Sequence, residues 1–323
     1  MKILVTGSQG FIGSYLVGSL LDAGHSICGL DKSTKHSPQR DYKVINGSIL
    51  NRADTLRAMD DVECIIHLAA EHKDQGISKE QYFQVNQIGT HVLLECATEA
   101  GVVKIIFFST VAVYGGSGAA DEGKLPQPTN NYGASKLAAE AEIATWTAEG
   151  PDRKAVVIRP SVVFGPSNYA NIYRLIKKIS DGEFWWPGHG RNVKSVAYVE
   201  NLVSATLFLM DRMSSGIAYY NYSDEPQHTM KELVNLIAEK AEQQISRFYF
   251  PFTIVLAGVG LLELIGRVIK LQSQITVDRL RKFCQHTEYP AEKIRSLGFR
   301  QPFSLEEGIA KTVGWYLKSV KQV

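Results

Sequence analysis

The fold is decided by the first stretch of the chain, Ile3-Leu4-Val5-Thr6-Gly7-Ser8-Gln9-Gly10-Phe11-Ile12-Gly13. Its apolar, β-branched start predicts a short strand. Three glycines follow at a spacing of three, and Ser14 to Leu21 then carries apolar residues at helical intervals. Glycine in such a turn tolerates a positive φ angle and lets a ligand approach the backbone. The N-terminus of the next helix offers free N–H groups and a partial positive charge, which suit a pyrophosphate.

A glycine motif alone is also compatible with an ordinary strand-to-helix turn, so the residues that follow decide its meaning. The segment His25-Ser26-Ile27-Cys28-Gly29-Leu30-Asp31 reads as a second strand that ends in an acid, 18 residues after Gly13. That is about the separation at which a carboxylate reaches the ribose hydroxyls of a bound adenosine. Because an acid repels a 2′-phosphate, Asp31 predicts NAD, although Lys32 leaves room for NADP.

The composition is typical of a soluble globular chain. The 323 residues are 45% hydrophobic and 21% charged, with a net charge of +2, and can form one large domain or two. No long basic run is present, so nucleic acid is not an expected partner. The scattered cysteines show no metal-ligand spacing, which predicts no metal site and fits a reducing cytoplasm. A strand that starts at residue 3 leaves no room for a signal peptide.

Short β-branched runs alternate with helical patterns through the first half of the chain. Because these runs are apolar on both faces, they predict an α/β fold with a doubly wound parallel sheet of the Rossmann type. We expect residues 1–165 to bind NAD, completed by elements near 196–222. We expect residues 166–323 to form mainly a smaller, interleaved substrate-binding region. The later strands are expected at Lys43–Ser48, Cys64–Ala70, Val103–Thr110 and Ala155–Pro160, with helices at Val85–Gly101 and Leu137–Thr147.

The segment from Phe248 to Leu271 is strongly apolar. A membrane-spanning helix needs about 20 apolar residues. Pro251 interrupts this segment early, and Glu263 and Arg267 interrupt it later, so we expect no membrane span. A buried or cleft-covering helix is the favoured interpretation, and contact with a membrane surface or a second copy is the alternative.

Three side chains with complementary chemistry follow the fifth expected strand. Tyr132 precedes Lys136 by four residues, which places both on one face of a helix. A neighbouring ammonium stabilises a phenolate, so Tyr132 can exchange a proton near neutral pH. Thr110 ends a parallel strand, where ligands of such sheets bind, and can hydrogen-bond the reacting oxygen. A Tyr-x-x-x-Lys pair is often only a surface feature, but here it follows a dinucleotide motif.

With these motifs in this order, the chain resembles the extended short-chain dehydrogenases/reductases, within the NAD-dependent epimerase/dehydratase family. The matching segments include His67-Leu68-Ala69-Ala70, Val113-Tyr114-Gly115, Arg159-Pro160 and Val199-Glu200-Asn201. The resemblance implies that Thr110, Tyr132 and Lys136 are catalytic and that a homodimer is one arrangement of the chain. The residues expected at NAD are Gly7, Gly10, Phe11, Ile12, Gly13, Asp31, Lys32, Ser48, Ile49, Leu68, Ala69, Ala70, Asn86, Ser109, Tyr132, Lys136, Pro160 and Val162.

Several positions depart from the family pattern. Ser48 stands where many relatives carry an acid beside the adenine. Val111-Ala112 stands where sugar dehydratases carry Asp-Glu, and neither side chain can act as an acid or a base, so a 4,6-dehydratase is not expected. Lys194 falls where sugar-nucleotide epimerases place an arginine on the diphosphate. A second diphosphate cation is not located, and Arg279 and Arg281 are equally well interpreted as a solvated helix face.

The remaining substrate candidate is aromatic. Trp186, with Trp185 beside it, can stack on a nucleotide base or pack the smaller region, and the sequence does not separate these roles. The leading hypothesis is an NAD-dependent epimerase at C4 of a UDP-sugar, acting through a 4-keto intermediate with Tyr132 as acid and base. The alternatives are a reductase or dehydrogenase of a 4-keto sugar or a bulky, sterol-like alcohol, and a non-enzymatic NAD sensor or scaffold.

Overall fold

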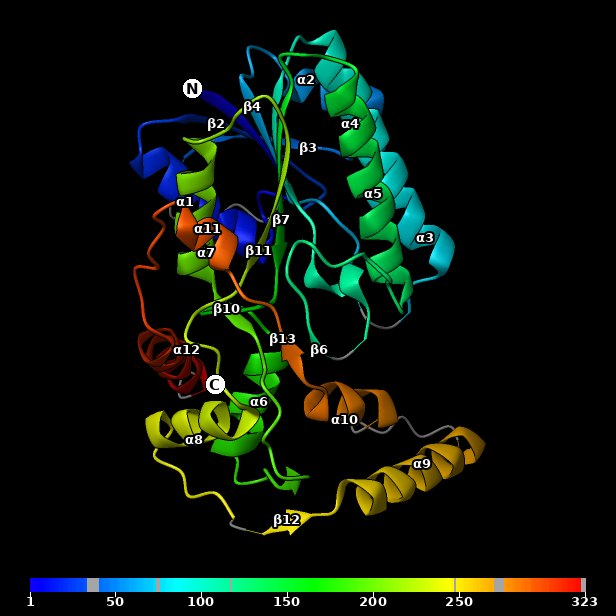
Figure 1. The fold of residues 1–323 in the computed structure, drawn as a ribbon, viewed down its shortest axis with the longest axis vertical. Helices are drawn as coiled ribbons and strands as arrows, with labels where there is room; N and C mark the ends of the chain where they lie inside the picture. The colour runs from blue at the N-terminus through cyan, green and yellow to red at the C-terminus, as the bar shows by residue number, and fades with distance from the viewer. Residues whose placement is uncertain (34–40, 74–75, 117, 247, 270–275, 321–323) are drawn as a thin grey trace.

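The computed structural model describes residues 1–33, 41–73, 76–116, 118–246, 248–269 and 276–320. Its centre is a seven-stranded sheet in the order β11-β7-β5-β4-β1-β2-β3, and every neighbouring pair is parallel (Figure 1). The predicted doubly wound α/β fold is therefore confirmed. The strands are β1 (Lys2–Thr6), β2 (Ser26–Asp31), β3 (Lys43–Asn46), β4 (Cys64–His67), β5 (Lys104–Phe108), β7 (Lys154–Pro160) and β11 (Gly216–Tyr222).

Helices cover both faces of this sheet, because its strands are apolar on both sides. They are α1 (Phe11–Asp22), α7 (Val199–Met210) and α11 (Glu292–Ser296) on one face, and α2 (Arg52–Ala58), α4 (Gly89–Glu99) and α5 (Asn131–Ala148) on the other. Alternate residues of β1 are buried in the cores on opposite faces of the sheet. Ile3 and Val5 are buried in the core beneath α1 and α7, and Leu4 is buried in the core beneath α4 and α5.

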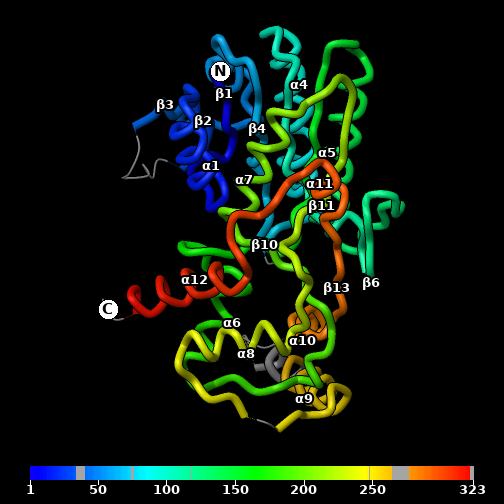
Figure 2. The backbone as a smooth tube through the Cα atoms, turned by 60° about the vertical axis from the view of Figure 1, so that its left-hand side comes forward, coloured from blue at the N-terminus to red at the C-terminus, as the bar shows by residue number. Residues whose placement is uncertain are grey.

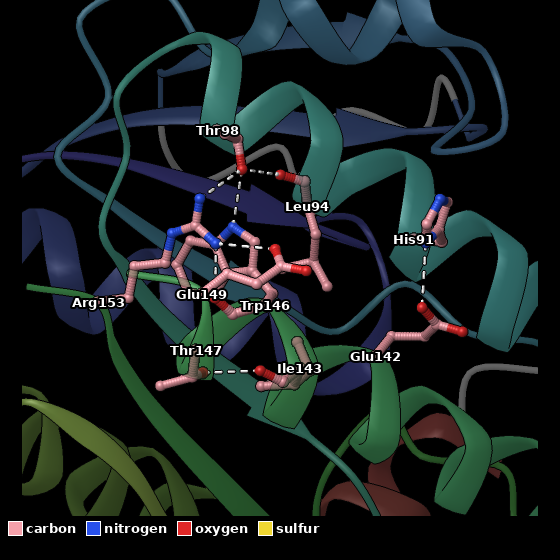
Figure 3. A network of polar contacts seen from close by, with 9 residues as sticks. All are labelled: His91, Leu94, Thr98, Glu142, Ile143, Trp146, Thr147, Glu149 and Arg153. Atoms are coloured by element: carbon pink, nitrogen blue, oxygen red, sulfur yellow. Dashed lines mark hydrogen bonds and ion pairs between the residues drawn. The ribbon is translucent and has the colours of Figure 1, made fainter. Parts of the chain in front are cut away.

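Polar contacts join α4 to α5 at the edge of their apolar interface (Figure 3). Trp146 Nε1 donates to Thr98 Oγ1 at 3.0 Å, and Arg153 Nη2 donates to the same oxygen at 3.1 Å. The guanidinium of Arg153 lies 4.7 Å from the centre of the Trp146 ring. Farther along the pair, His91 Nδ1 and Glu142 Oε2 are 3.0 Å apart. These contacts hold α5, which carries Tyr132 and Lys136, against α4.

The second half of the chain builds a separate core and also returns to the sheet. Buried residues of α6 (Asn171–Ser180), α8 (Met230–Lys240) and α12 (Leu305–Val320) surround this core. Short parallel strand pairs connect distant segments of the chain, whereas α7 and β11 belong to the central sheet layers. The expected completion of the NAD-binding domain by elements near 196–222 stays a prediction. The boundary at residue 165 stays a prediction. The short pairs are β8 (Val162–Phe164) with β10 (Val196–Tyr198), β9 (Trp186–Pro187) with β12 (Tyr249–Phe250), and β6 (Gly118–Ala119) with β13 (Thr287–Glu288).

Two predicted helices have different bounds in the structure. The helix expected from Leu137 begins at Asn131, because the Asn130 side chain caps it by accepting from Gly133 N at 2.7 Å. The helix expected over Val85–Gly101 is divided into a π-helical turn, η1 (Gln84–Ile88), and α4.

The apolar segment forms α9 (Phe252–Ile269), which packs against α10 (Val277–Cys284). Among its described side chains only Val259 is buried, so the expectation of a buried helix is wrong for this part of the segment. No helix in the described part of the chain is long and apolar enough to span a bilayer.

Candidate active site

The glycine turn after β1 has the close backbone contacts that its sequence predicts. Gly7 has a φ of +73°, and a Cβ there would lie 2.8 Å from Ala69 N. A Cβ on Gly13 would lie 2.2 Å from Gly7 O. Only glycine fits both positions without moving backbone. The N-cap of α1 is Gly10, which contributes no side-chain cap, so this end of the helix suits the phosphates of a dinucleotide.

Asp31 ends β2 beside this turn. Its Oδ2 accepts from Gln9 N at 2.9 Å, and its Oδ1 accepts from Ser33 N at 2.8 Å. The carboxylate is half-buried and fixed next to the glycine loop, as the ribose-binding prediction requires. Lys32 is exposed. After β3, Ser48 Oγ accepts from Leu50 N at 3.2 Å, so that hydroxyl is engaged locally.

The carboxyl ends of β1 and β4 bring another predicted group to the same edge. Leu68 N donates to Thr6 O, and Ala69 N donates to Thr6 Oγ1 at 3.2 Å. Asn86 is buried and holds the chain after Ala70, because its Oδ1 accepts from Glu71 N at 2.7 Å and its Nδ2 donates to Glu71 O. Asn86 therefore fixes the segment that the resemblance places along NAD.

Thr110 and Tyr132 lie on segments that touch. Thr110 follows β5, and its Oγ1 accepts from Ala112 N at 3.1 Å to cap the short helix η2 (Val111–Tyr114). A Cβ on Gly133 would lie 2.5 Å from Ala112 O, so glycine lets the first turn of α5 approach η2. Tyr132 is half-buried, with its ring centre 6.2 Å from that of Tyr82. The structure thus brings Thr110 close to the tyrosine–lysine helix.

Lys136 is almost completely buried, at 2% exposure, in the second turn of α5. Its Nζ lies 4.0 Å from the centre of the Phe107 ring. Burial lowers the pKa of Lys136 to about 7, and the negative charge of Glu140, one helical turn farther on, raises that pKa. A cation at this depth suits a site that stabilises a phenolate and holds a ribose.

Sequence reasoning missed Glu140, which the structure places at the centre of a buried network. Arg159 Nε donates to Glu140 Oε1 at 2.9 Å, and Arg159 Nη2 donates to Oε2 at 2.6 Å. The Ser109 hydroxyl donates to Oε1, and Arg159 Nη1 donates to the Tyr114 hydroxyl at 2.8 Å. The signal was available, because Glu140 follows Lys136 by four residues on one helix face.

Two other predicted cofactor positions lie beside this network. Pro160 ends β7, where Ser109 N donates to Ile158 O at 2.7 Å, and Val162 begins β8 two residues later. The carboxyl ends of β5 and β7 therefore meet next to Ser109. His67 is buried between Thr6 Oγ1 at 2.7 Å and a second threonine hydroxyl.

The substrate residues predicted in the second half of the chain, Trp186 and Lys194, are engaged in contacts within that half. Trp186 is 2% exposed and packs against Phe184 and Tyr249, so the packing role left open by the sequence describes its position. Lys194 Nζ donates to Lys282 O of α10 at 2.8 Å. Burial lowers the pKa of Lys194 to about 8. Its role at a diphosphate stays a prediction.

Neither of the two arginines considered for the second diphosphate contact is buried. Arg279 and Arg281 lie on α10 with exposed side chains, as the solvated-face interpretation expects. Among the described residues, no three histidine, cysteine or acidic side chains gather in a way that could hold a metal ion.

Comparisons with known proteins agree with this geometry. Residues 3–223 match the model of the NAD dependent epimerase/dehydratase family. The chain is 31% identical to N-acetyl-alpha-D-glucosaminyl-diphospho-ditrans,octacis-undecaprenol 4-epimerase of Escherichia coli O157:H7, over 99% of this chain and 97% of that protein. It is also 31% identical to dTDP-D-glucose 4,6-dehydratase of Mus musculus, over 98% and 89%.

Among solved structures, MoeE5 in complex with UDP-glucose and NAD superposes with a TM-score of 0.77. The identity is 26%, and the match covers 99% of this chain and 100% of that one. Together with the glycine turn, Asp31 and the buried tyrosine–lysine helix, these matches identify the cofactor as NAD. The chain belongs to the NAD dependent epimerase/dehydratase family and is an NAD-dependent enzyme of the extended short-chain dehydrogenase/reductase type.

Proposed function

We propose that the protein is a sugar 4-epimerase, which inverts C4 of a hexose bound through its diphosphate. The observation that supports this most directly is the contact between the Thr110 turn and the first turn of α5. Val111 and Ala112 directly follow Thr110, and they occupy the places where a dehydratase needs an acid and a base. Tyr132 can exchange the proton, whereas positions 111 and 112 carry neither an acid nor a base. This combination suits epimerisation better than removal of water.

The proposed chemistry uses one proton and one hydride. Tyr132, as a phenolate, takes the proton of the C4 hydroxyl, and Thr110 hydrogen-bonds the same oxygen. NAD, when bound, would supply the hydride exchange at C4, which removes the hydride from one face of the sugar and restores it to the other. The 4-keto sugar turns over between the two transfers, and Tyr132 then returns the proton. Lys136 stabilises the phenolate of Tyr132 through its charge and holds the ribose.

The sugar diphosphate can be attached to either of two groups, a nucleoside or a polyprenol, which are called its carriers below. Both carriers fit this proposal. The sequence predicts a UDP-sugar, and MoeE5 was crystallised with UDP-glucose. The relative from Escherichia coli acts on a sugar diphosphate carried by a polyprenol. Lys194 can meet the diphosphate of either carrier as a point charge.

The test is to incubate the purified protein, without added cofactor, with UDP-glucose, UDP-N-acetylglucosamine or N-acetylglucosaminyl-diphospho-undecaprenol, and to analyse the sugars released by mild acid. We expect the C4 epimer of at least one substrate and no net change in NADH absorbance. Tyr132→Phe should slow product formation by about 10²–10⁴-fold, whereas Tyr169→Phe, at an exposed tyrosine, should not. Net NAD(P)H consumption with a keto substrate, and no epimer from any of the three, would replace the proposal with a reductase.

A further inference from the structure

The described part of α9 reverses the usual pattern of a surface helix. Its exposed positions are 253, 254, 257, 258, 261 and 262, a spacing that forms one helical face. None of these residues is charged, and Ile254, Leu261 and Leu262 are 67%, 59% and 59% exposed. A globular helix normally presents charged residues at such positions. This face therefore needs an apolar environment.

The single acid in this part of the helix is turned away from the exposed face. Glu263 Oε1 accepts from Val277 N at 2.8 Å, at the start of α10. A Cβ on Gly260 would lie 3.9 Å from Val277 Cγ2. The inner side of α9 thus meets α10, where Glu263 is used. Over residues 252–263, the outer side of α9 therefore carries no charge.

An aromatic cluster extends the same surface before α9 begins. Phe248 and Phe250 are 65% and 43% exposed, with ring centres 5.2 Å apart, and Trp185 lies edge-on to Phe250 at 5.8 Å. The β12–β9 pair anchors this cluster to the core. Figures 1 and 2 both place α9 and β12 at the end of the molecule away from the central sheet. We call these aromatic residues and the exposed face of α9 the apical surface.

Basic residues accompany the apical surface. Arg279 and Arg281 are exposed on α10, the helix that packs against α9. An apolar helical face with aromatic residues at one end and exposed arginines on the neighbouring helix suits the headgroup region of an anionic membrane. Membranes of that kind attract juxtamembrane Lys and Arg.

We propose that the apical surface docks on the surface of an anionic lipid bilayer without crossing it. This goes beyond the proposed function, because it concerns where the enzyme works and holds for either carrier. It also places the predicted diphosphate residue near the membrane, since Lys194 Nζ donates to Lys282 O on the α10 that packs against α9. A diphosphate carried by a membrane lipid would then reach the enzyme at the docked end.

The test is flotation of the full chain with vesicles of phosphatidylethanolamine and phosphatidylglycerol, and separately with vesicles of phosphatidylcholine alone. We expect the wild type to float with the anionic vesicles. Leu261→Gln/Leu262→Gln should lower the partition coefficient by more than about tenfold, because two leucine side chains leave the lipid. Leu125→Gln/Leu297→Gln, two exposed leucines elsewhere, should leave it unchanged.

The outcomes separate docking from catalysis. The α9 variant should retain NAD and any activity on a water-soluble sugar diphosphate, so loss of flotation with retained activity supports docking. Failure of the wild type to float, equal binding to phosphatidylcholine, or equal loss in both variants would overturn the proposal. A concentration-dependent dimer that the α9 variant abolishes, without flotation, would also overturn it and assign the surface to a second copy. None of these results depends on which sugar is epimerised.

Discussion

Arg159 Nη2 lies 2.6 Å from Glu140 Oε2, and the two side chains are only 5% and 3% exposed. The pair fixes a carboxylate one helical turn beyond Lys136, where its charge favours the buried ammonium. Because each charge is buried, neither partner can be removed without leaving the other uncompensated.

Glu140→Gln should therefore lower the free energy of unfolding by about 3–5 kcal/mol, since Arg159 stays buried without its counter-charge. Urea denaturation measures this change. The double variant Glu140→Leu/Arg159→Met should regain most of the lost stability, because it buries no unpaired charge. If the double variant is as unstable as the single one, burial of an uncompensated charge is not the cause.

Lys136 should make the stability of the NAD-free protein depend on pH. Its pKa is about 7 in the folded protein, and about 10.4 in an unfolded chain. Between these values the unfolded state binds more protons, so this group makes the free energy of unfolding rise with pH. The rise should be smaller in Lys136→Met when both proteins are denatured at pH values of about 7 and about 9. Identical slopes would show that the ammonium is not destabilised by burial.

Tyr132→Phe should reduce kcat by about 10²–10⁴-fold, because general acid–base catalysis by one positioned side chain contributes that much. The NAD content of the purified variant should match the wild type, since the ring remains. Quantifying the nucleotide released on denaturation provides the control. A Tyr132→Phe protein with an unchanged kcat would remove Tyr132 from the proton transfer.

Asp31→Asn should reduce the preference for NAD over NADP by more than about tenfold. The variant removes the negative charge that repels a 2′-phosphate, and it weakens charge-assisted hydrogen bonds to the loop. Titration of the cofactor-free protein with each nucleotide measures the ratio. Asp211→Asn, at an exposed helix end, is the matched control and should bind both nucleotides as the wild type does. An unchanged ratio would place the ribose away from Asp31.

The sequence was most informative where the chemistry is local. The strands of the sheet are continuous apolar runs, and their burial on both faces follows directly from that composition. Gly7 and Gly13 are fixed by contacts within a few residues or with the adjacent strand. Asp31 lies at the end of its strand, as predicted.

The start of α5 shows why boundaries were harder. The sequence pattern predicted a helix from Leu137, and Gly133 normally discourages one. In the structure Gly133 is needed, because α5 presses against Ala112 O, and Asn130 caps the turn. The contact with Ala112 depends on a segment about twenty residues earlier in the chain, whose approach cannot be read from helical periodicity. The Asn130 cap is local.

The sequence by itself determined the parallel sheet and the glycine turn, and it placed Tyr132 and Lys136 on one helix face, because strand burial, glycine geometry and helical spacing are properties of short segments. The catalytic roles of Thr110, Tyr132 and Lys136 stay predictions. Only the tertiary structure decided that Glu140 pairs with Arg159, that Trp186 packs in a core, and that α9 turns its apolar face outward. The sequence shows that a buried apolar residue needs apolar neighbours and that a buried charged residue needs an opposite charge. Which partner it receives depends on how distant segments pack, and the sequence pattern of one helix carries no such information.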